Sequence, residues 1–176
     1  IQPFVEVLDE SGIPYHIGGS VASSVFGIAR STMDVDMVAA ITMEHVTALV
    51  TKLESVYYIS EAAIREAISR KSSFNLVHLE TMMKVDVFIL KSRPFDQAAF
   101  QRRRKDHLDS ENPQRMYYVS SPEDIILNKL GWYQKGGMKS ERQWTDIIGI
   151  LKVQGDSLDL KYCKDWAQQL GGAQLL

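Results

Sequence analysis

The sequence contains a single cysteine, Cys163, among 176 residues. One cysteine cannot form an intramolecular disulfide or a cysteine-based metal site, so the composition suits a reducing compartment, and we expect a cytoplasmic protein. No apolar run approaches the roughly 20 residues that span a bilayer, and the opening IQPFVEVLDE lacks the basic-then-apolar pattern of a signal peptide. We therefore expect a soluble protein with no membrane partner.

An excess of basic charge is also missing. The 20 Lys and Arg residues face 22 Asp and Glu residues, which gives a net charge of -2. This balance argues against a protein that coats nucleic acid by bulk electrostatics. A local patch is still compatible with it: Arg102 to Lys105 is a basic run that either holds an RNA or DNA backbone or forms a solvated helix face.

What is present is enough apolar sequence, 45% of the residues, for one ordinary globular domain. The periodicity predicts strands and helices in mixed order, followed by a mostly helical last third. The polar stretch DSENPQ is the best internal boundary, and we divide the chain into a core of residues 1–110 and a segment of residues 111–176. The predicted helices cover residues 3–10, 21–29, 42–53, 61–70, 95–108, 140–153 and 156–170, with another after Ser121, and the predicted strands cover residues 15–17, 34–40, 56–59, 74–79, 83–90 and 115–119.

Three aspartates stand out because they lie on predicted strands. Asp34 and Asp36 share one face of the first, and Asp86 lies in the middle of the apolar run MKVDVFIL. An unpaired carboxylate is costly to bury, so such a group needs an ion, a basic partner or an exposed cleft edge. Oxygen ligands without His or Cys suit Mg²⁺. A half-exposed strand, with Asp86 paired to Lys84 or an Arg, explains the same spacing.

A glycine turn precedes the paired acids. Gly18, Gly19 and Ser20 join a predicted strand to a predicted helix. Free backbone N–H groups and a helix N-terminus make a natural anion site at such a turn, to which Ser20 adds a hydroxyl group. The position of the turn immediately upstream of Asp34 and Asp36 indicates a place for phosphate groups.

The string GGSVASSVFGIARSTMDVDMV at residues 18–38 resembles the signature of the nucleotidyltransferase superfamily related to DNA polymerase β. A spacer of thirteen residues separates Gly19-Ser20 from Asp34, and Asp86 matches the third acid of the family. Within the superfamily the chain is most similar to minimal nucleotidyltransferases and to abortive-infection (AbiEii-type) toxin nucleotidyltransferases. This narrower likeness rests on SPEDIILNKL followed by RQWTDIIGIL.

The resemblance implies an α+β fold in which a mixed sheet is flanked by helices and followed by a C-terminal helical segment. It also implies that Asp34 and Asp36 hold Mg²⁺ or Mn²⁺ ions, and that Asp86 shares the catalytic ion and helps to deprotonate the acceptor hydroxyl. A nucleoside triphosphate, with ATP among the candidates, binds as substrate at the glycine turn. The likeness to the toxin branch further implies an antitoxin as a protein partner.

Three further residues are candidates for contact with the nucleotide. Lys129 lies on the apolar stripe of its predicted helix, where it either snorkels to water or, as the resemblance implies, contacts nucleotide phosphate. Asp146 either takes part in the site or pairs with Arg142 one turn back. Arg30 precedes the paired acids, where it either contacts a phosphate or is an exposed loop residue.

We therefore predict a metal-dependent nucleotidyltransferase that transfers a nucleoside monophosphate to an acceptor oxygen and releases pyrophosphate. The acceptor is a small molecule, a protein or an RNA, since all of these use the same carboxylate chemistry. A catalytically silent nucleotide- or partner-binding module of the same fold is the alternative. A toxin that acts on tRNA is a variant of the first hypothesis, and the run from Arg102 to Lys105 is its only support.

Overall fold

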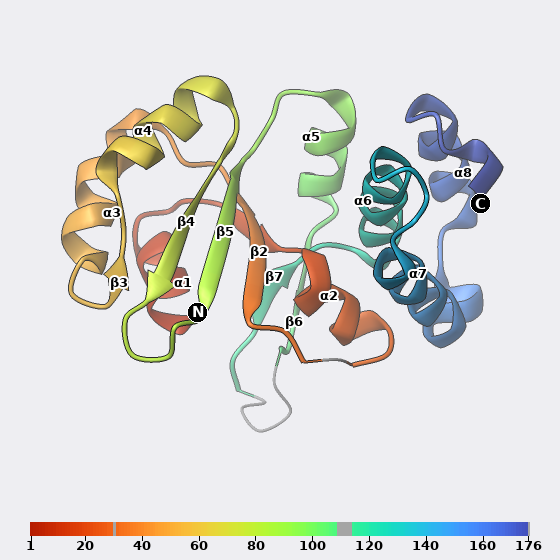
Figure 1. Cartoon of the computed structure of the whole chain (residues 1–176), viewed down its shortest axis with the longest axis horizontal. Coiled ribbons are helices and arrows are strands. Elements are labelled where there is room, and N and C mark those ends of the chain that lie inside the picture. Colours follow the sequence, from red (N-terminus) through yellow and green to blue (C-terminus); the bar gives the residue numbers. More distant parts are fainter. Residues whose placement is uncertain (30, 109–113, 176) are drawn as a thin grey trace.

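A computed structural model describes residues 1–29, 31–108 and 114–175 (Figure 1). Strands and helices are interspersed up to β7, and the remaining elements are helical. The elements are α1 (Gln2–Glu10), β1 (Tyr15–Ile17), α2 (Gly19–Phe26), β2 (Asp34–Ala39), η1 (Met43–His45), α3 (Val46–Leu53), β3 (Tyr57–Tyr58), α4 (Glu61–Arg70), β4 (Ser73–His78), β5 (Lys84–Ile89), α5 (Pro94–Gln101), β6 (Arg104–Asp106), β7 (Tyr117–Val119), α6 (Pro122–Lys135), α7 (Glu141–Gln154), η2 (Gly155–Ser157), α8 (Leu160–Gln169) and η3 (Ala173–Leu175).

The strands form one mixed sheet in the order β3-β4-β5-β2-β1-β7-β6. Strand β2 runs parallel to β5 and β1 runs parallel to β7, whereas the other neighbours are antiparallel. The expected α+β class and mixed sheet are confirmed. The division at residues 110 and 111 stays a prediction, and the segment after it contributes β7 to the sheet between β1 and β6.

One face of the sheet carries the main core. Along β2 and β5 every second residue is buried, among them Val35, Met37, Val85 and Val87. They belong to the same apolar cluster as the buried residues of α1, α3 and α4. The alternating residues, which include the aspartates, therefore lie on the opposite face.

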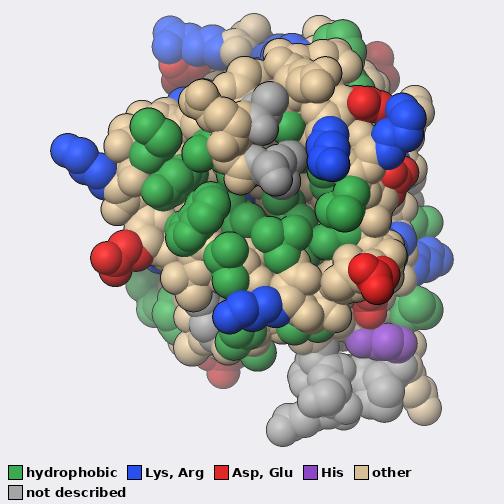
Figure 2. Space-filling model, turned by 90° about the vertical axis from the view of Figure 1, so that its right-hand side faces the viewer, with side chains coloured by type: hydrophobic (Ala, Val, Ile, Leu, Met, Phe, Trp, Pro, Cys, Tyr) green, Lys and Arg blue, Asp and Glu red, His purple; other side chains and the backbone are tan. Residues whose placement is uncertain are grey.

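Helix α2 connects the sheet to the helical end of the molecule, where it packs against β2, α6 and α7. The backbone after α2 approaches α7 closely, because a Cβ atom on Gly27 would lie 3.0 Å from the Ile150 backbone nitrogen and 3.1 Å from the Gly149 carbonyl carbon. Figure 2 shows that hydrophobic side chains gather on the outer face of this helical end. Exposed large hydrophobic residues of this part of the chain are Trp132, Met138, Trp144, Val153, Leu160 and Leu170.

The segment after α5 differs from the expected helix over residues 95–108. The helix ends at Gln101, and residues 104–106 form the edge strand β6, which pairs with β7. Tertiary contacts override the helix propensity of this stretch. The basic run accordingly lies over aromatic rings: Arg102 over Tyr162, Arg103 over Phe100, Arg104 over Phe26 and Lys105 over Tyr118.

Another boundary shifts at α8. The helix predicted over residues 156–170 begins only at Leu160, because the Asp159 carboxylate accepts a hydrogen bond from the Tyr162 N–H at 2.9 Å and caps α8. Most of the predicted loop DSENPQ, residues 109–113, lies outside the described residues. No helix in the described ranges has the length and apolar content that a bilayer crossing requires.

The close approach of α2 and α7 gives a stability test. We expect Gly27→Ala to lower the free energy of unfolding by about 1–3 kcal/mol, because the added methyl group meets backbone atoms that cannot rotate away. Gly131→Ala is the matched control: it lies inside α6, its Cβ would meet no atom within 4 Å, and it should stabilise the protein by roughly 0.5–1 kcal/mol. Urea denaturation measures both, and equal effects would contradict the packing argument.

Candidate active site

The aspartates of β2 and β5 lie on the sheet face opposite the main core. Asp36 pairs in register with Asp86 on the neighbouring parallel strand, and Asp34 pairs in register with Lys84. Neighbouring strands run about 4.8 Å apart, so the side chains of Asp36 and Asp86 start from adjacent positions. The fold thus brings the three predicted acids onto one small area of the sheet.

The acids repel one another in this arrangement. Burial raises the pKa of Asp36, and the negative charges of Asp86 and Asp34 raise it further, whereas the positive charges of Lys129 and Lys84 act in the opposite direction. Lys84 Nζ lies 2.8 Å and 2.9 Å from the two carboxylate oxygens of Asp86. The sequence left a pairing of Asp86 with Lys84 open, and the structure contains it. A bound cation would relieve the remaining repulsion at Asp36.

The glycine turn lies directly against these acids. The Gly18 N–H donates a hydrogen bond to the backbone oxygen of Asp36 at 2.8 Å. Gly19 has a φ of 55°, and a Cβ atom there would lie 1.8 Å from Asp36 Oδ2, so the backbone needs glycine at this position. Ser20 follows in the first turn of α2. The N-terminus of α2, where the helix dipole favours negative charge, therefore lies beside Asp36.

Arg142 reaches the same turn from the helical end. Its Nη2 atom donates to Ser20 Oγ at 3.4 Å from the first turn of α7, and the side chain is otherwise exposed. Sequence reasoning treated Arg142 only as an alternative partner of Asp146. No local pattern signals the contact, because it joins two helices that are distant in the sequence.

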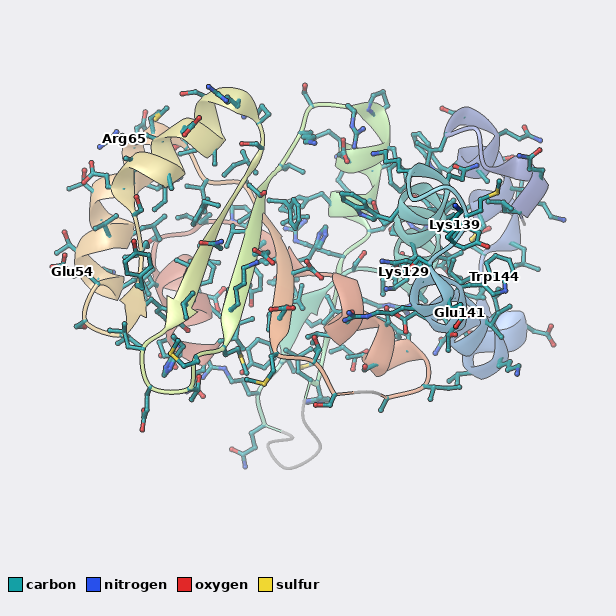
Figure 3. All side chains as sticks on the ribbon, in the orientation of Figure 1. Glu54, Arg65, Lys129, Lys139, Glu141 and Trp144 are labelled. Carbon is teal, nitrogen blue, oxygen red and sulfur yellow. The ribbon has the colours of Figure 1, made fainter. Side chains whose placement is uncertain are left out.

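Lys129 and Asp146 form a buried ion pair between α6 and α7. Lys129 Nζ lies 2.8 Å from Asp146 Oδ2 and 3.2 Å from Gln143 Oε1, and each charged side chain is only 6% exposed. Lys129 therefore does not snorkel to water, and Asp146 pairs with Lys129. Figure 3 shows Lys129 on the side of these helices that faces α2, with Trp144 on the opposite side. A contact between Lys129 and nucleotide phosphate stays a prediction.

No family model matches the chain, and no curated protein matches it. Similar solved structures include ANT(2'')-Ia in complex with adenylyl-2''-tobramycin, with a TM-score of 0.62 and 13% identity over 96% of this chain and 93% of that chain. The antigenic nucleotidyltransferase-like protein from Paracoccidioides brasiliensis gives 0.55 and 21% over 96% and 86%. The lincosamide antibiotic adenylyltransferase LnuA, in a lincomycin-bound structure, gives 0.53 and 17% over 85% and 92%.

This chain has the nucleotidyltransferase fold. The expected superfamily fold is confirmed, whereas the narrower likeness to minimal and abortive-infection nucleotidyltransferases stays a prediction. At these identities the likeness concerns the fold, so the chemistry has to be argued from this chain's own residues.

The nucleotidyltransferase fold implies divalent metal ions, and the donor set fits them in one specific way. No three side chains of the His, Cys, Asp and Glu types converge within residues 1–29, 31–108 and 114–175. Asp36 and Asp86 nevertheless supply two adjacent carboxylates, and Mg²⁺ typically takes one or two carboxylates together with substrate phosphates. The site therefore suits an ion that arrives with a polyphosphate, and it is not a closed cage made of protein ligands.

Two further predictions concern Arg30 and the basic run from Arg102 to Lys105. Arg30 falls outside the described residues. The basic run forms no solvated helix face, and Arg102 there also lies 3.2 Å from a Glu123 oxygen. A cavity of about 310 Å³ opens beside it, lined by Arg102, Arg104, Ser121 and Glu123. Each of these basic side chains thus makes a ring contact, and Arg104 and Lys105 are also exposed.

The buried ion pair predicts a non-additive pair of substitutions. Lys129→Met removes the cation beside the buried Asp146 carboxylate, and we expect a loss of about 3–5 kcal/mol in the free energy of unfolding. The double variant Lys129→Met/Asp146→Leu should recover most of that loss, because no charge remains buried at the position. Denaturant unfolding of both variants measures the difference. Equal losses in the single and double variants would show that the pair contributes only packing.

Proposed function

We propose that this protein is a Mg²⁺- or Mn²⁺-dependent nucleotidyltransferase that transfers a nucleoside monophosphate from a nucleoside triphosphate to an acceptor hydroxyl group and releases pyrophosphate. The pairing of Asp36 with Asp86 directly beside the glycine turn carries the proposal. Neighbours with the same fold are described as bound to adenylyl-2''-tobramycin and as a lincosamide adenylyltransferase. ATP is therefore the donor to test first, and a small hydroxylated molecule is the acceptor class to test first.

The glycine turn and Arg142 would bind the polyphosphate of the donor. The N-terminus of α2, which begins at Gly19, favours negative charge at this point. Arg142 adds a guanidinium group that is held near the turn by its hydrogen bond to Ser20. The positive charge of Lys129 acts on Asp36 beside the turn and opposes the rise in the pKa of this carboxyl group.

Asp36 and Asp86 would hold a divalent ion that arrives with the polyphosphate, and Asp34 on the same face of β2 would be a further ligand. When bound, such ions neutralise the developing charge on the phosphate oxygens and stabilise the leaving group. The Asp86 carboxylate would accept the acceptor hydroxyl's proton as the acceptor oxygen bonds to the α-phosphorus. The bond from the α-phosphorus to the bridging oxygen breaks, and pyrophosphate leaves with that electron pair. Lys84, which contacts both carboxylate oxygens of Asp86, would hold this side chain in one orientation until the acceptor binds.

No observation favours the other predicted roles. All three acids are present on one face, which a silent binding module would not need. The run from Arg102 to Lys105, the only feature that supported tRNA as acceptor, lies on and just before β6, which β7 and β1 separate from the acid-bearing strand β2. We therefore do not propose the toxin role or an antitoxin partner.

Asp36→Asn separates function from stability. The change removes one of the mutually repelling charges, so we expect the metal-free protein to gain stability, with a rise in Tm of about 2–4 °C for each kcal/mol. We expect pyrophosphate release to fall at least about 100-fold, because the metal ligand set is broken. The exposed Asp156→Asn should change neither quantity. Full turnover by the Asp36 variant would refute the assignment.

Arg142→Ala should act on nucleotide binding. We expect the KM for the nucleoside triphosphate to rise about 10-fold with a smaller change in kcat, because the contact is made in the ground state as well. Arg142→Lys should recover part of the affinity. Arg65→Ala, which Figure 3 shows on α4 at the other end of the molecule, is the control. An unchanged KM in Arg142→Ala, or an equal rise in Arg65→Ala, would remove Arg142 from the phosphate site.

A further inference from the structure

The row of residues that contains the acids continues onto β4. Asn75 pairs in register with Asp86, Asp86 pairs with Asp36, and the Gly18 N–H bonds to the Asp36 oxygen. The four residues thus lie side by side across the three strands β4, β5 and β2 and the glycine turn that follows β1. Asn75 is exposed, and its side-chain amide has no hydrogen-bond partner in the described part of the chain. Asparagine is also disfavoured within strands, so strand propensity does not explain its presence in SFNLVH.

The proposed reaction assigns the two ends of this row to different substrates. The polyphosphate binds at the glycine end, so pyrophosphate leaves towards Gly18 and α2. In a displacement at phosphorus the attacking and leaving oxygens lie roughly in line. The acceptor hydroxyl must therefore approach from the opposite end, past Asp86 and over Asn75.

We propose that the exposed face of β4 and β5 around Asn75 is the acceptor site, and that the Asn75 amide positions the acceptor by hydrogen bonds to an oxygen near the reacting hydroxyl. This inference rests on the proposed function. The amide offers both a carbonyl acceptor and two N–H donors, which match a hydroxyl group in either role. Asn75 is a positioning residue, and Asp86 beside it remains the group that takes the proton.

The surroundings of Asn75 restrict the chemical class of the acceptor. The adjacent row consists of Ser73, Phe88 and Val38, where Phe88 and Val38 are partly exposed and present an apolar strip. The three aspartates outnumber Lys84 and Lys129, the two cations that act on Asp36 in the described part of the chain, and Lys129 is itself paired with Asp146, so an anionic acceptor is repelled. The site therefore fits a compact, hydroxylated molecule with an apolar side and without anionic groups, such as an uncharged or aminated sugar.

Sheet order argues against a nucleic-acid acceptor at this site. The basic run lies on and just before β6, and four strands separate β6 from β4. At about 4.8 Å for each step, an RNA held by that run is roughly 24 Å from Asn75 along the sheet. The residues that could neutralise a phosphate backbone and the residues that receive the acceptor are thus at opposite ends.

The test compares Asn75→Ala with wild type on an acceptor panel of uncharged sugars, aminated sugars and tRNA, with labelled ATP and Mg²⁺. We expect label on a sugar, and we expect kcat/KM for that sugar to fall about 10-fold or more in the variant, as for a lost hydrogen bond. The affinity for ATP with Mg²⁺, measured by calorimetry, should be unchanged. Asn75→Gln should restore part of the loss, and Thr51→Ala, an exposed change on α3, should have no effect.

Three results would overturn the inference while leaving the proposed function intact. These are an unchanged kcat/KM for the acceptor in Asn75→Ala, an equal loss of ATP affinity, and transfer to tRNA alone. Absence of any transfer or pyrophosphate release by the wild-type protein would instead refute the proposed function, and with it the acceptor site. The two failures are therefore distinguishable in one set of measurements.

Discussion

Electrostatic repulsion between two carboxylates on adjacent parallel strands is the constraint on which the candidate site depends. The negative charges of Asp36 and Asp86 repel each other in the folded chain, and burial further disfavours the charged form of Asp36. Natural sheets avoid such pairs because like charges directly opposite each other are destabilising. The surrounding cations, Lys84 and Lys129, reduce the repulsion without removing it. The site therefore has a negative electrostatic potential that a bound cation would neutralise.

Helix α2 connects the acidic site on the sheet to the helices at the end of the molecule. Its first residue approaches the Asp36 carboxylate more closely than any side chain would permit, and its last turn leads into the glycine contact with α7. The same helix packs on both α6 and α7, which carry the buried pair of Lys129 and Asp146. Helix α2 therefore joins the sheet to the helical end at the point where the proposed donor binds.

Much of this could be predicted from the sequence, because the relevant signals are local. Alternation along Asp34–Ala39 and Lys84–Ile89 assigns the acids to one face, and the glycine turn is visible as a motif. Long-range contacts were out of reach. Nothing near Arg142 reports its bond to Ser20, and the register that aligns Asn75 with Asp86 follows from strand pairing. The strand at Arg104–Asp106 was missed because pairing with β7 outweighs its helical composition.

The two outermost strands have a consequence for behaviour in concentrated solution. A sheet ends in rows of free N–H and C=O groups that invite a second chain to pair with them. Here β3 has only two residues, and β6 has three, all of them charged. The six-residue strands β2, β4 and β5 are shielded inside the sheet. Both rims are thus poor templates for strand addition, which disfavours aggregation through the sheet edges.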